Sequence, residues 1–160
     1  MKAKFWIGLV FTTAIVVFAI VASGGSVLVY FDIPSLVMIA LIPASIAFAS
    51  WPLGEIRRAF TALHDPAAGR AELEKSALFF ESIIRWMLYA AFAGLMIGLV
   101  AILRYYDGNQ VGKLGRNLAV MLLCNTEALF LIIVFPIPLA AIARRRLAGL
   151  NGDPGATGRH

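Results

Sequence analysis

A single carboxylate interrupts the last apolar stretch of this chain. Between Asn117 and Ala143 the sequence reads LAVMLLCNTEALFLIIVFPIPLAAI, in which Glu127 is the only group expected to carry charge at neutral pH. In a helix that rises about 1.5 Å per residue, Glu127 lies about 15 Å below the start of this run, near the midplane of a hydrocarbon core about 30 Å thick. A carboxylate at that depth is energetically costly, so a functional role is the default hypothesis.

Three residues with smaller polar groups precede this carboxylate: Cys124, Asn125 and Thr126. One hypothesis is that all four residues belong to an ion pathway, in which Glu127 carries a proton or binds Na⁺ and releases it when water or a cation arrives. The other is that Glu127 is structural, either neutral or hydrogen-bonded to a neighbouring polar group. The sequence leaves both interpretations open.

The composition identifies a membrane protein. Of 160 residues, 61% are hydrophobic and 14% are charged, and the mean hydropathy is +0.85. Apolar runs long enough to span a bilayer, about 18 residues or more, occur four times. They cover residues 5–31, 33–54, 86–103 and 117–143, the last across Glu127. The sequence therefore predicts an all-α fold of four transmembrane helices.

The positions of Lys and Arg predict the orientation. Basic residues cluster before the first run, between the second and third, and after the fourth: Lys2, Lys4, Arg57, Arg58, Arg70, Lys75, Arg85, Arg144, Arg145 and Arg146. Fewer basic residues fall on the other side: Arg104, Lys113 and Arg116. The positive-inside rule places both termini and the middle connection in the cytoplasm of a bacterial inner membrane. The last three arginines are expected to anchor the final helix at the anionic inner leaflet.

The chain divides into four parts on this basis. Residues 1–54 contain the first two spans, 55–85 form a short cytoplasmic helical connection, 86–146 contain the last two spans, and 147–160 form a disordered cytoplasmic tail. Residues 71–85 carry apolar side chains at helical spacing and are expected to run directly into the third span. Charged residues in the connection have two interpretations, a reduced docking surface for a cytoplasmic partner or plain solvated surface: Arg57, Arg58, Glu72 and Lys75.

Helix ends and close contacts can also be predicted. Asp32 is expected to cap the second span, with Pro34 in its first turn. Pro43 falls in the middle of that span, where a kink with a packing role is expected. Gly94 and Gly98 form a small-xxx-small pair that favours close helix contact, either between subunits or within one.

Several functional classes find no support. The single cysteine, Cys124, excludes an intrachain disulfide and is expected to be a small packing residue. The sequence has no Gly-rich phosphate loop, nucleophile elbow or ligand-spaced cluster of His, Cys and carboxylates, so we expect neither an enzyme nor a metal site. The net charge of +5 reflects membrane topology and does not indicate nucleic-acid binding.

Three stretches together resemble the MotA branch of the MotA/TolQ/ExbB proton-channel family. Residues 30–36 (YFDIPSL) and 51–59 (WPLGEIRRA) are similar to the start and end of the second span of MotA-type stator proteins. Residues 94–103 (GLMIGLVAIL) are similar to the third span. Residues 118–123 (LAVMLL) and 135–140 (FPIPLA) are similar to the fourth, with Pro138 at the family's proline position. The resemblance covers most of the chain, and its specificity lies in the order and spacing of the motifs.

The resemblance implies an assembly and an activity. Family members form a pentamer around two copies of a single-span, MotB-like partner, and a flow of H⁺ or Na⁺ drives rotation or force. The present chain would then be a subunit of an ion-driven motor, surrounded by membrane lipids, with its third and fourth spans lining the partner. It would need no cofactor other than the transported ion.

The chain departs from the family at several positions. Its cytoplasmic connection is much shorter, which makes contact with a standard flagellar rotor doubtful. Leu88 and Leu95 replace a proline and a threonine of the third span, and the polar pair of the fourth span aligns with Cys124 and Asn125. Two alternatives therefore stay open: a non-conducting scaffold or accessory subunit of the same fold, and an unrelated small four-span transporter subunit.

Overall fold

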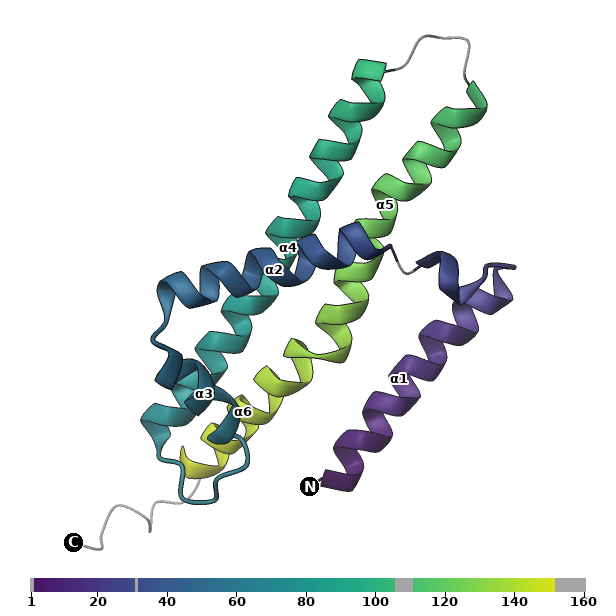
Figure 1. The fold of residues 1–160 in the computed structure, drawn as a ribbon. Helices are drawn as coiled ribbons and strands as arrows, with labels where there is room; N and C mark the ends of the chain where they lie inside the picture. Colours follow the sequence, from purple (N-terminus) through teal and green to yellow (C-terminus); the bar gives the residue numbers. More distant parts are fainter. Residues whose placement is uncertain (1, 31, 106–110, 152–160) are drawn as a thin grey trace, which may run out of the picture.

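The computed structural model describes residues 2–30, 32–105 and 111–151, and these residues contain helices and no strand. Figure 1 shows their order along the chain. The helices are α1 (Lys2–Ala22), the 3₁₀ helix η1 (Val27–Tyr30), α2 (Ile33–Ser50), α3 (Leu53–Thr61), α4 (Arg70–Tyr105), α5 (Val111–Val134) and α6 (Pro136–Asn151). The expected all-α fold is confirmed for this part of the chain.

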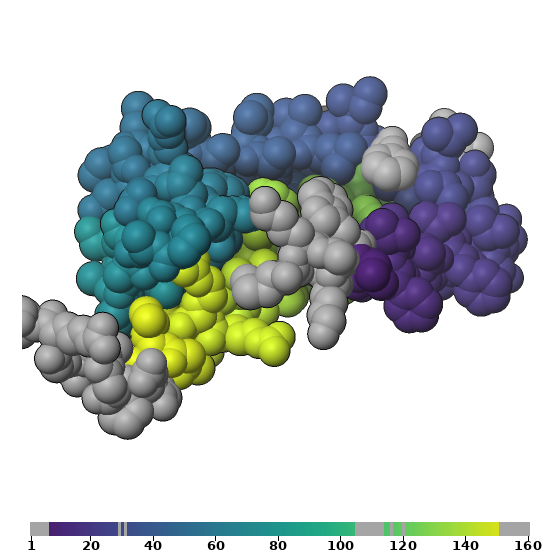
Figure 2. All heavy atoms as spheres, turned by 90° about the horizontal axis from the view of Figure 1, so that it is seen from below, coloured from purple at the N-terminus to yellow at the C-terminus, as the bar shows by residue number. Residues whose placement is uncertain are grey.

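The two long helices α4 and α5 form the central hairpin of the fold. They run side by side, α6 continues beyond α5, and α2 crosses both α4 and α5 (Figure 1). Helix α1 contacts α5 and η1. Viewed from below, α3, α4 and α6 form one closely packed group and α1 forms another (Figure 2). The start of α2 lies beside α5, on the side of the hairpin where α1 and η1 also contact α5.

Three helical segments are long and apolar enough to cross a membrane. They cover Ile33–Ser50, Arg70–Arg104 and Asn117–Leu150. The first predicted span corresponds to α1, in which Ile7–Ala22 forms a shorter apolar helix. The length and composition of these helices support a membrane protein.

The beginning of α2 has the predicted cap. The carboxylate of Asp32 accepts a hydrogen bond from the backbone N–H of Ser35 at 3.0 Å, and Pro34 lies in the first turn. Both features suit a helix start, where side chains satisfy backbone N–H groups that lack helical partners. Pro43 is buried inside α2, which continues through it to Ser50.

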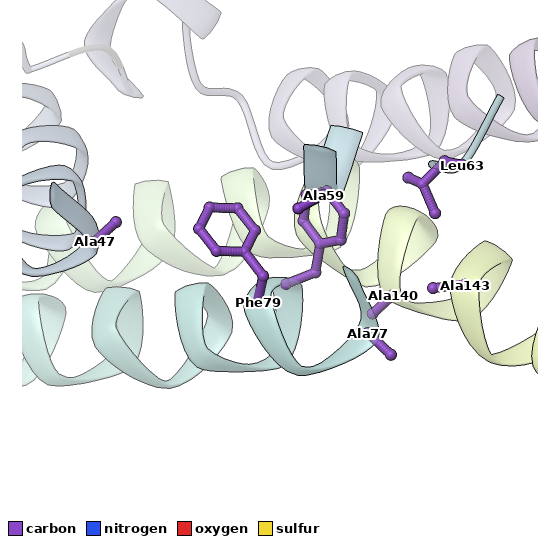
Figure 3. Close-up of a cluster of buried hydrophobic side chains, with 8 residues drawn as sticks. Ala47, Ala59, Leu63, Ala77, Phe79, Ala140 and Ala143 are labelled. Atoms are coloured by element: carbon purple, nitrogen blue, oxygen red, sulfur yellow. The ribbon is translucent and has the colours of Figure 1, made fainter. Parts of the chain in front are cut away.

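A compact hydrophobic core joins α2, α3, α4 and α6 at one end of the hairpin. Its buried members are mostly alanines, together with two phenylalanines and one leucine: Ala47, Ala59, Leu63, Ala77, Phe79, Phe80, Ala140 and Ala143 (Figure 3). The small side chains let the helices approach, and the aromatic rings fill the remaining space. Phe60 packs edge-on against Phe80, with ring centroids 5.1 Å apart. This core packs the connection between the second and third spans against α6.

The predicted fourth span lies within the apolar segment Asn117–Leu150, whereas the predicted tail begins too early. The span is built of two helices, since α5 ends at Val134 and α6 begins at Pro136, a residue that has no backbone N–H to donate. Pro138 lies in the first turn of α6. The tail was expected to begin at residue 147, yet α6 continues to Asn151 because Leu147 packs on both buried clusters of this end. The rest of the predicted tail, 152–160, lies outside the described residues.

Candidate functional site

The carboxyl group of Glu127 lies inside the protein at the start of α2. The side chain of Glu127 is only 5% exposed, and its Oε1 accepts a hydrogen bond from the backbone N–H of Asp32 at 2.5 Å. The two residues are 95 positions apart in the sequence. The contact therefore joins the middle of α5 to the turn that leads from η1 into α2.

The neighbouring carboxylate of Asp32 points into its own helix cap. Its Oδ2 accepts the backbone N–H of Ser35 at 3.0 Å and the hydroxyl of Ser35 at 2.7 Å. Ser35 is itself 8% exposed. Asp32 thus receives two donors from α2 and gives its own backbone N–H to Glu127.

This contact corrects the depths expected from the sequence. As the cap of the second span, Asp32 would lie at a membrane interface, whereas Glu127 was expected near the midplane, about half a hydrocarbon core away. A hydrogen bond between them requires one common depth. Helix α5 must therefore continue well past the connection between α1 and α2, since Glu127 is 16 positions from its first residue, Val111.

Two buried polar atoms have no hydrogen-bond partner among the described residues. They are Oε2 of Glu127 and Nδ2 of Asn125. A buried polar atom without a partner typically destabilises the folded state by about 1–3 kcal/mol. Oε1 of Glu127 already accepts the N–H of Asp32, so Oε2 is the oxygen that can still accept a hydrogen bond or bind a proton or cation.

Two cavities flank the contact between Asp32 and Glu127. The smaller, which we call the α1 cavity, has a volume of about 130 Å³ and is lined by α1, η1, α2 and α5, including Thr13, Tyr30 and Glu127. The larger, the α4 cavity, has a volume of about 430 Å³ and lies between the start of α2, α4 and α5. Asp32, Ser35, Asn117 and Cys124 are among its lining residues. The two carboxylates therefore border different cavities.

The other polar residues predicted for an ion pathway are distributed around α5. Cys124 is buried, Asn125 is half-buried, and Thr126 is exposed with its hydroxyl donated to the carbonyl of Leu122 at 3.2 Å. Thr126 also borders the α1 cavity, together with Glu127. Asn125 lines neither of these two cavities.

The glycine pair of α4 provides close packing within the chain. A Cβ atom at Gly94 would lie 2.7 Å from Sγ of Cys124, and one at Gly98 would lie 2.8 Å from Cγ of Met121. Of the two explanations left open by the sequence, contact inside one subunit accounts for both glycines. They supply no separate support for an oligomer.

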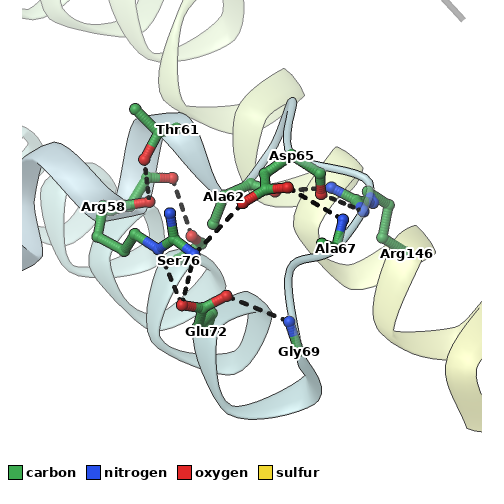
Figure 4. Close-up of polar contacts among 10 residues, drawn as sticks. Arg58, Thr61, Ala62, Asp65, Ala67, Gly69, Glu72, Ser76 and Arg146 are labelled. Atoms are coloured by element: carbon green, nitrogen blue, oxygen red, sulfur yellow. Dashed lines mark hydrogen bonds and ion pairs between the residues drawn. The ribbon is translucent and has the colours of Figure 1, made fainter.

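The residues predicted for cytoplasmic docking are largely engaged with one another. Arg58 forms ion pairs with Glu72 at 2.7 Å and Asp65 at 3.3 Å (Figure 4), and Lys75 pairs with Glu55 at 2.5 Å. The hydrogen bond and the charge of Glu72 raise the pKa of the Arg58 guanidinium above its ordinary value. Arg57 is exposed. These pairs join α3 to α4 across the turn, and Arg58 and Lys75 stay about half exposed within them, so the docking surface stays a prediction.

Two of the three arginines near the end of α6 also have partners within the protein. The guanidinium of Arg146 donates to the carbonyls of Ala62 at 2.6 Å and Asp65 at 2.8 Å (Figure 4), and Arg144 pairs with Glu81 at 2.5 Å. Arg145 is exposed. These contacts hold α6 against α3 and α4, and the anchoring of the three arginines at the anionic leaflet stays a prediction, with Arg144 and Arg145 exposed.

Comparisons with known proteins assign no family. No protein-family model matches the chain, and no curated protein matches it. Within the described ranges, no group of three or more His, Cys, Asp or Glu side chains could hold a metal ion. Sequence reasoning found Glu127 but missed its hydrogen bond to the backbone of Asp32, because no periodicity or motif connects residues 95 positions apart.

Proposed function

We propose that this chain is a MotA-like subunit of an ion-driven, stator-type motor in a bacterial inner membrane. Copies of the chain, five by the resemblance, would surround a MotB-like single-span partner, and a flow of H⁺ or Na⁺ would produce rotation or force. One observation supports the functional part of the proposal. The carboxyl group of Glu127 is buried among apolar helices with one oxygen uncommitted.

A buried carboxyl group of this kind suits ion transfer for a physical reason. Removing a carboxylate from water favours a bound proton or cation, and such groups in membrane helices typically mark ion pathways. The composition of α5 fits a helix that also meets another apolar surface. Its exposed side includes Leu118, Leu122, Leu129 and Ile133, which a partner helix or lipid would cover.

The scaffold alternative is favoured by a different observation. Oε1 of Glu127 accepts the backbone N–H of Asp32 in the same chain, which is what a purely structural carboxyl group would do. Leu88 and Leu95, at the family's proline and threonine positions, agree with that alternative. A scaffold would keep the fold and the oligomer without conducting ions.

The substitution Glu127→Gln separates the two functions. Glutamine keeps an oxygen that can accept the N–H of Asp32, but it cannot bind and release a proton at neutral pH. We expect E127Q to reduce ion flux to background in vesicles that contain the chain and its co-expressed membrane partner. Ser45→Ala, which removes an exposed hydroxyl on α2, is the matched control and should conduct normally.

Cryo-electron microscopy of the same complex tests the assembly. Five copies of this chain around two partner helices are expected for the motor. Normal flux in E127Q, or a different stoichiometry, would count against the motor. If the wild-type complex does not conduct ions, and the E127Q complex assembles with the same stoichiometry, the chain is a scaffold.

A further inference from the structure

The two carboxyl groups at the start of α2 are unequally supplied with hydrogen-bond donors. Asp32 accepts the backbone N–H and the hydroxyl of Ser35, both on Oδ2, whereas Glu127 accepts one N–H on Oε1 and none on Oε2. Donors stabilise the ionised form of a carboxyl group, and burial without them stabilises the protonated form. Oε2 of Glu127 is therefore the buried oxygen of this pair that lacks a donor and has room for a bound proton.

No basic group balances two negative charges at this position. Among the described residues that line the two cavities there is no Lys, Arg or His, and the only other titratable groups are Tyr30 and Cys124. The charges of Asp32 and Glu127 would repel each other. Two neighbouring carboxylates in apolar surroundings without a basic partner are costly, so a proton or cation bound at this position would lower that cost.

The two groups differ in their access to water. Oε2 of Glu127 is buried, and the α1 cavity that Glu127 borders is small and lined mainly by apolar side chains. Asp32 is only half-buried and borders the α4 cavity, which is the larger of the two and has polar walls at Ser35 and Asn117 among mostly apolar ones. Water can therefore reach Asp32 more readily than Glu127.

We propose that Asp32 is the group through which Glu127 exchanges its proton with water in the α4 cavity, within one chain. In the uptake direction, the carboxylate of Asp32 takes a proton from hydronium, which becomes water, and passes it to the ionised carboxylate of Glu127, so that Asp32 returns to its anion. Release follows the reverse order. The exchange deepens the proposed ion path and rests on it for its biological use, but it needs no partner subunit.

The contact at the start of α2 makes this transfer short. Glu127 is bonded to the backbone N–H of the same residue whose side chain borders the α4 cavity. The two carboxyl groups therefore belong to residues in direct contact. One bridging water could complete the connection.

The experiment is a pH jump on the full chain in lipid nanodiscs, followed by time-resolved infrared spectroscopy. The C=O stretch of protonated Glu127 is assigned as the band that E127Q removes. Asp32→Asn is the test variant, because asparagine caps helices as well as aspartate and leaves the backbone N–H in place, but it cannot carry a proton. We expect D32N to keep the Glu127 band and to slow its response by about tenfold or more.

Further variants control for a structural effect. Ser45→Ala removes an exposed hydroxyl elsewhere on α2 and leaves both carboxyl groups and their donors in place, so its exchange should stay close to the wild-type rate. Asp32→Glu should restore fast exchange, because it returns a titratable carboxyl group. If D32N does not fold, as judged by circular dichroism, D32E is compared with wild type instead, and exchange within about threefold is expected.

These outcomes test the proton exchange of Glu127 through Asp32 independently of the proposed motor. An unchanged rate in D32N would overturn the proposal, as would the absence of any band removed by E127Q, or slow exchange in a folded D32E. Because the measurement uses the chain alone, a failed motor would instead appear as absent flux in the complex while Glu127 still exchanges through Asp32.

Discussion

Gly94 on α4 lies directly against the sulfur atom of Cys124 on α5. A Cβ atom added at Gly94 would stand 2.7 Å from Sγ, closer than real Cβ atoms approach another heavy atom. Hydrogen at this position therefore determines how closely the two long helices can pack. The same two helices carry the walls of the α4 cavity, so their spacing also affects the surroundings of Asp32 and Glu127.

The first prediction is that Gly94→Ala destabilises the protein. The added methyl group must displace Cys124 or separate the helices, and overpacking of this kind typically lowers the free energy of unfolding by about 1–3 kcal/mol. The loss can be measured as a lower unfolding midpoint in detergent. Gly115→Ala on α5 is the matched control, because a Cβ there meets nothing within 4 Å.

A second substitution tests whether Cys124 is the cause. Cys124→Ala removes Sγ and leaves a Cβ that lies 3.6 Å from the position of the added methyl group, an ordinary van der Waals distance. The double variant G94A/C124A should therefore lose less stability than the sum of the losses measured for G94A and C124A separately. Additive losses would show that the methyl group clashes elsewhere.

A buried hydroxyl gives the second prediction. Ser76 on α4 is fully buried, and its Oγ donates to the carbonyl of Ala59 on α3 at 2.8 Å. Ser76→Ala should lower the free energy of unfolding by about 1 kcal/mol, because the carbonyl loses its donor. Ser45→Ala, which removes an exposed hydroxyl, should change it much less. Equal effects would mean that burial of the contact is unimportant.

The sequence was informative where local physical chemistry determines the structure. The cap at Asp32, the first-turn Pro34 and the continuous helix from the connection into the third span all followed from residues close together in the chain. The apolar runs predicted the membrane helices because hydrocarbon requires long apolar segments. Gly94 was recognised as a position of close approach, although its neighbour was not.

The remaining features depend on which helices meet. Nothing near Glu127 in the sequence indicates that its partner is the backbone of Asp32, and depth counted along one helix ignores the tilt of the other. Arg146 was predicted to face lipid because basic residues after a span commonly do so. Its two carbonyl partners belong to the turn after α3, so only the folded chain reveals them.

The third prediction concerns the contact made by Arg146. Its guanidinium holds two backbone carbonyls of the turn between α3 and α4, so Arg146→Ala should increase the opening of that turn. Hydrogen–deuterium exchange of residues 62–68 is the appropriate measurement, because it reports local opening. Arg145→Ala, which removes an exposed arginine at the next position, should leave exchange unchanged. Equal exchange in R146A and wild type would show that the apolar contacts of Leu147 suffice.

The last prediction separates the acceptor function of Glu127 from its proton. Glu127→Leu has similar bulk but no oxygen, so the backbone N–H of Asp32 loses its partner and the start of α2 should loosen. We expect a loss of about 1–3 kcal/mol in the free energy of unfolding for E127L, and a smaller loss for E127Q, which retains an acceptor. Thermal unfolding in one detergent compares the three proteins. Equal stability of E127L and E127Q would mean that the N–H of Asp32 finds another acceptor, and that Glu127 is retained for its proton alone.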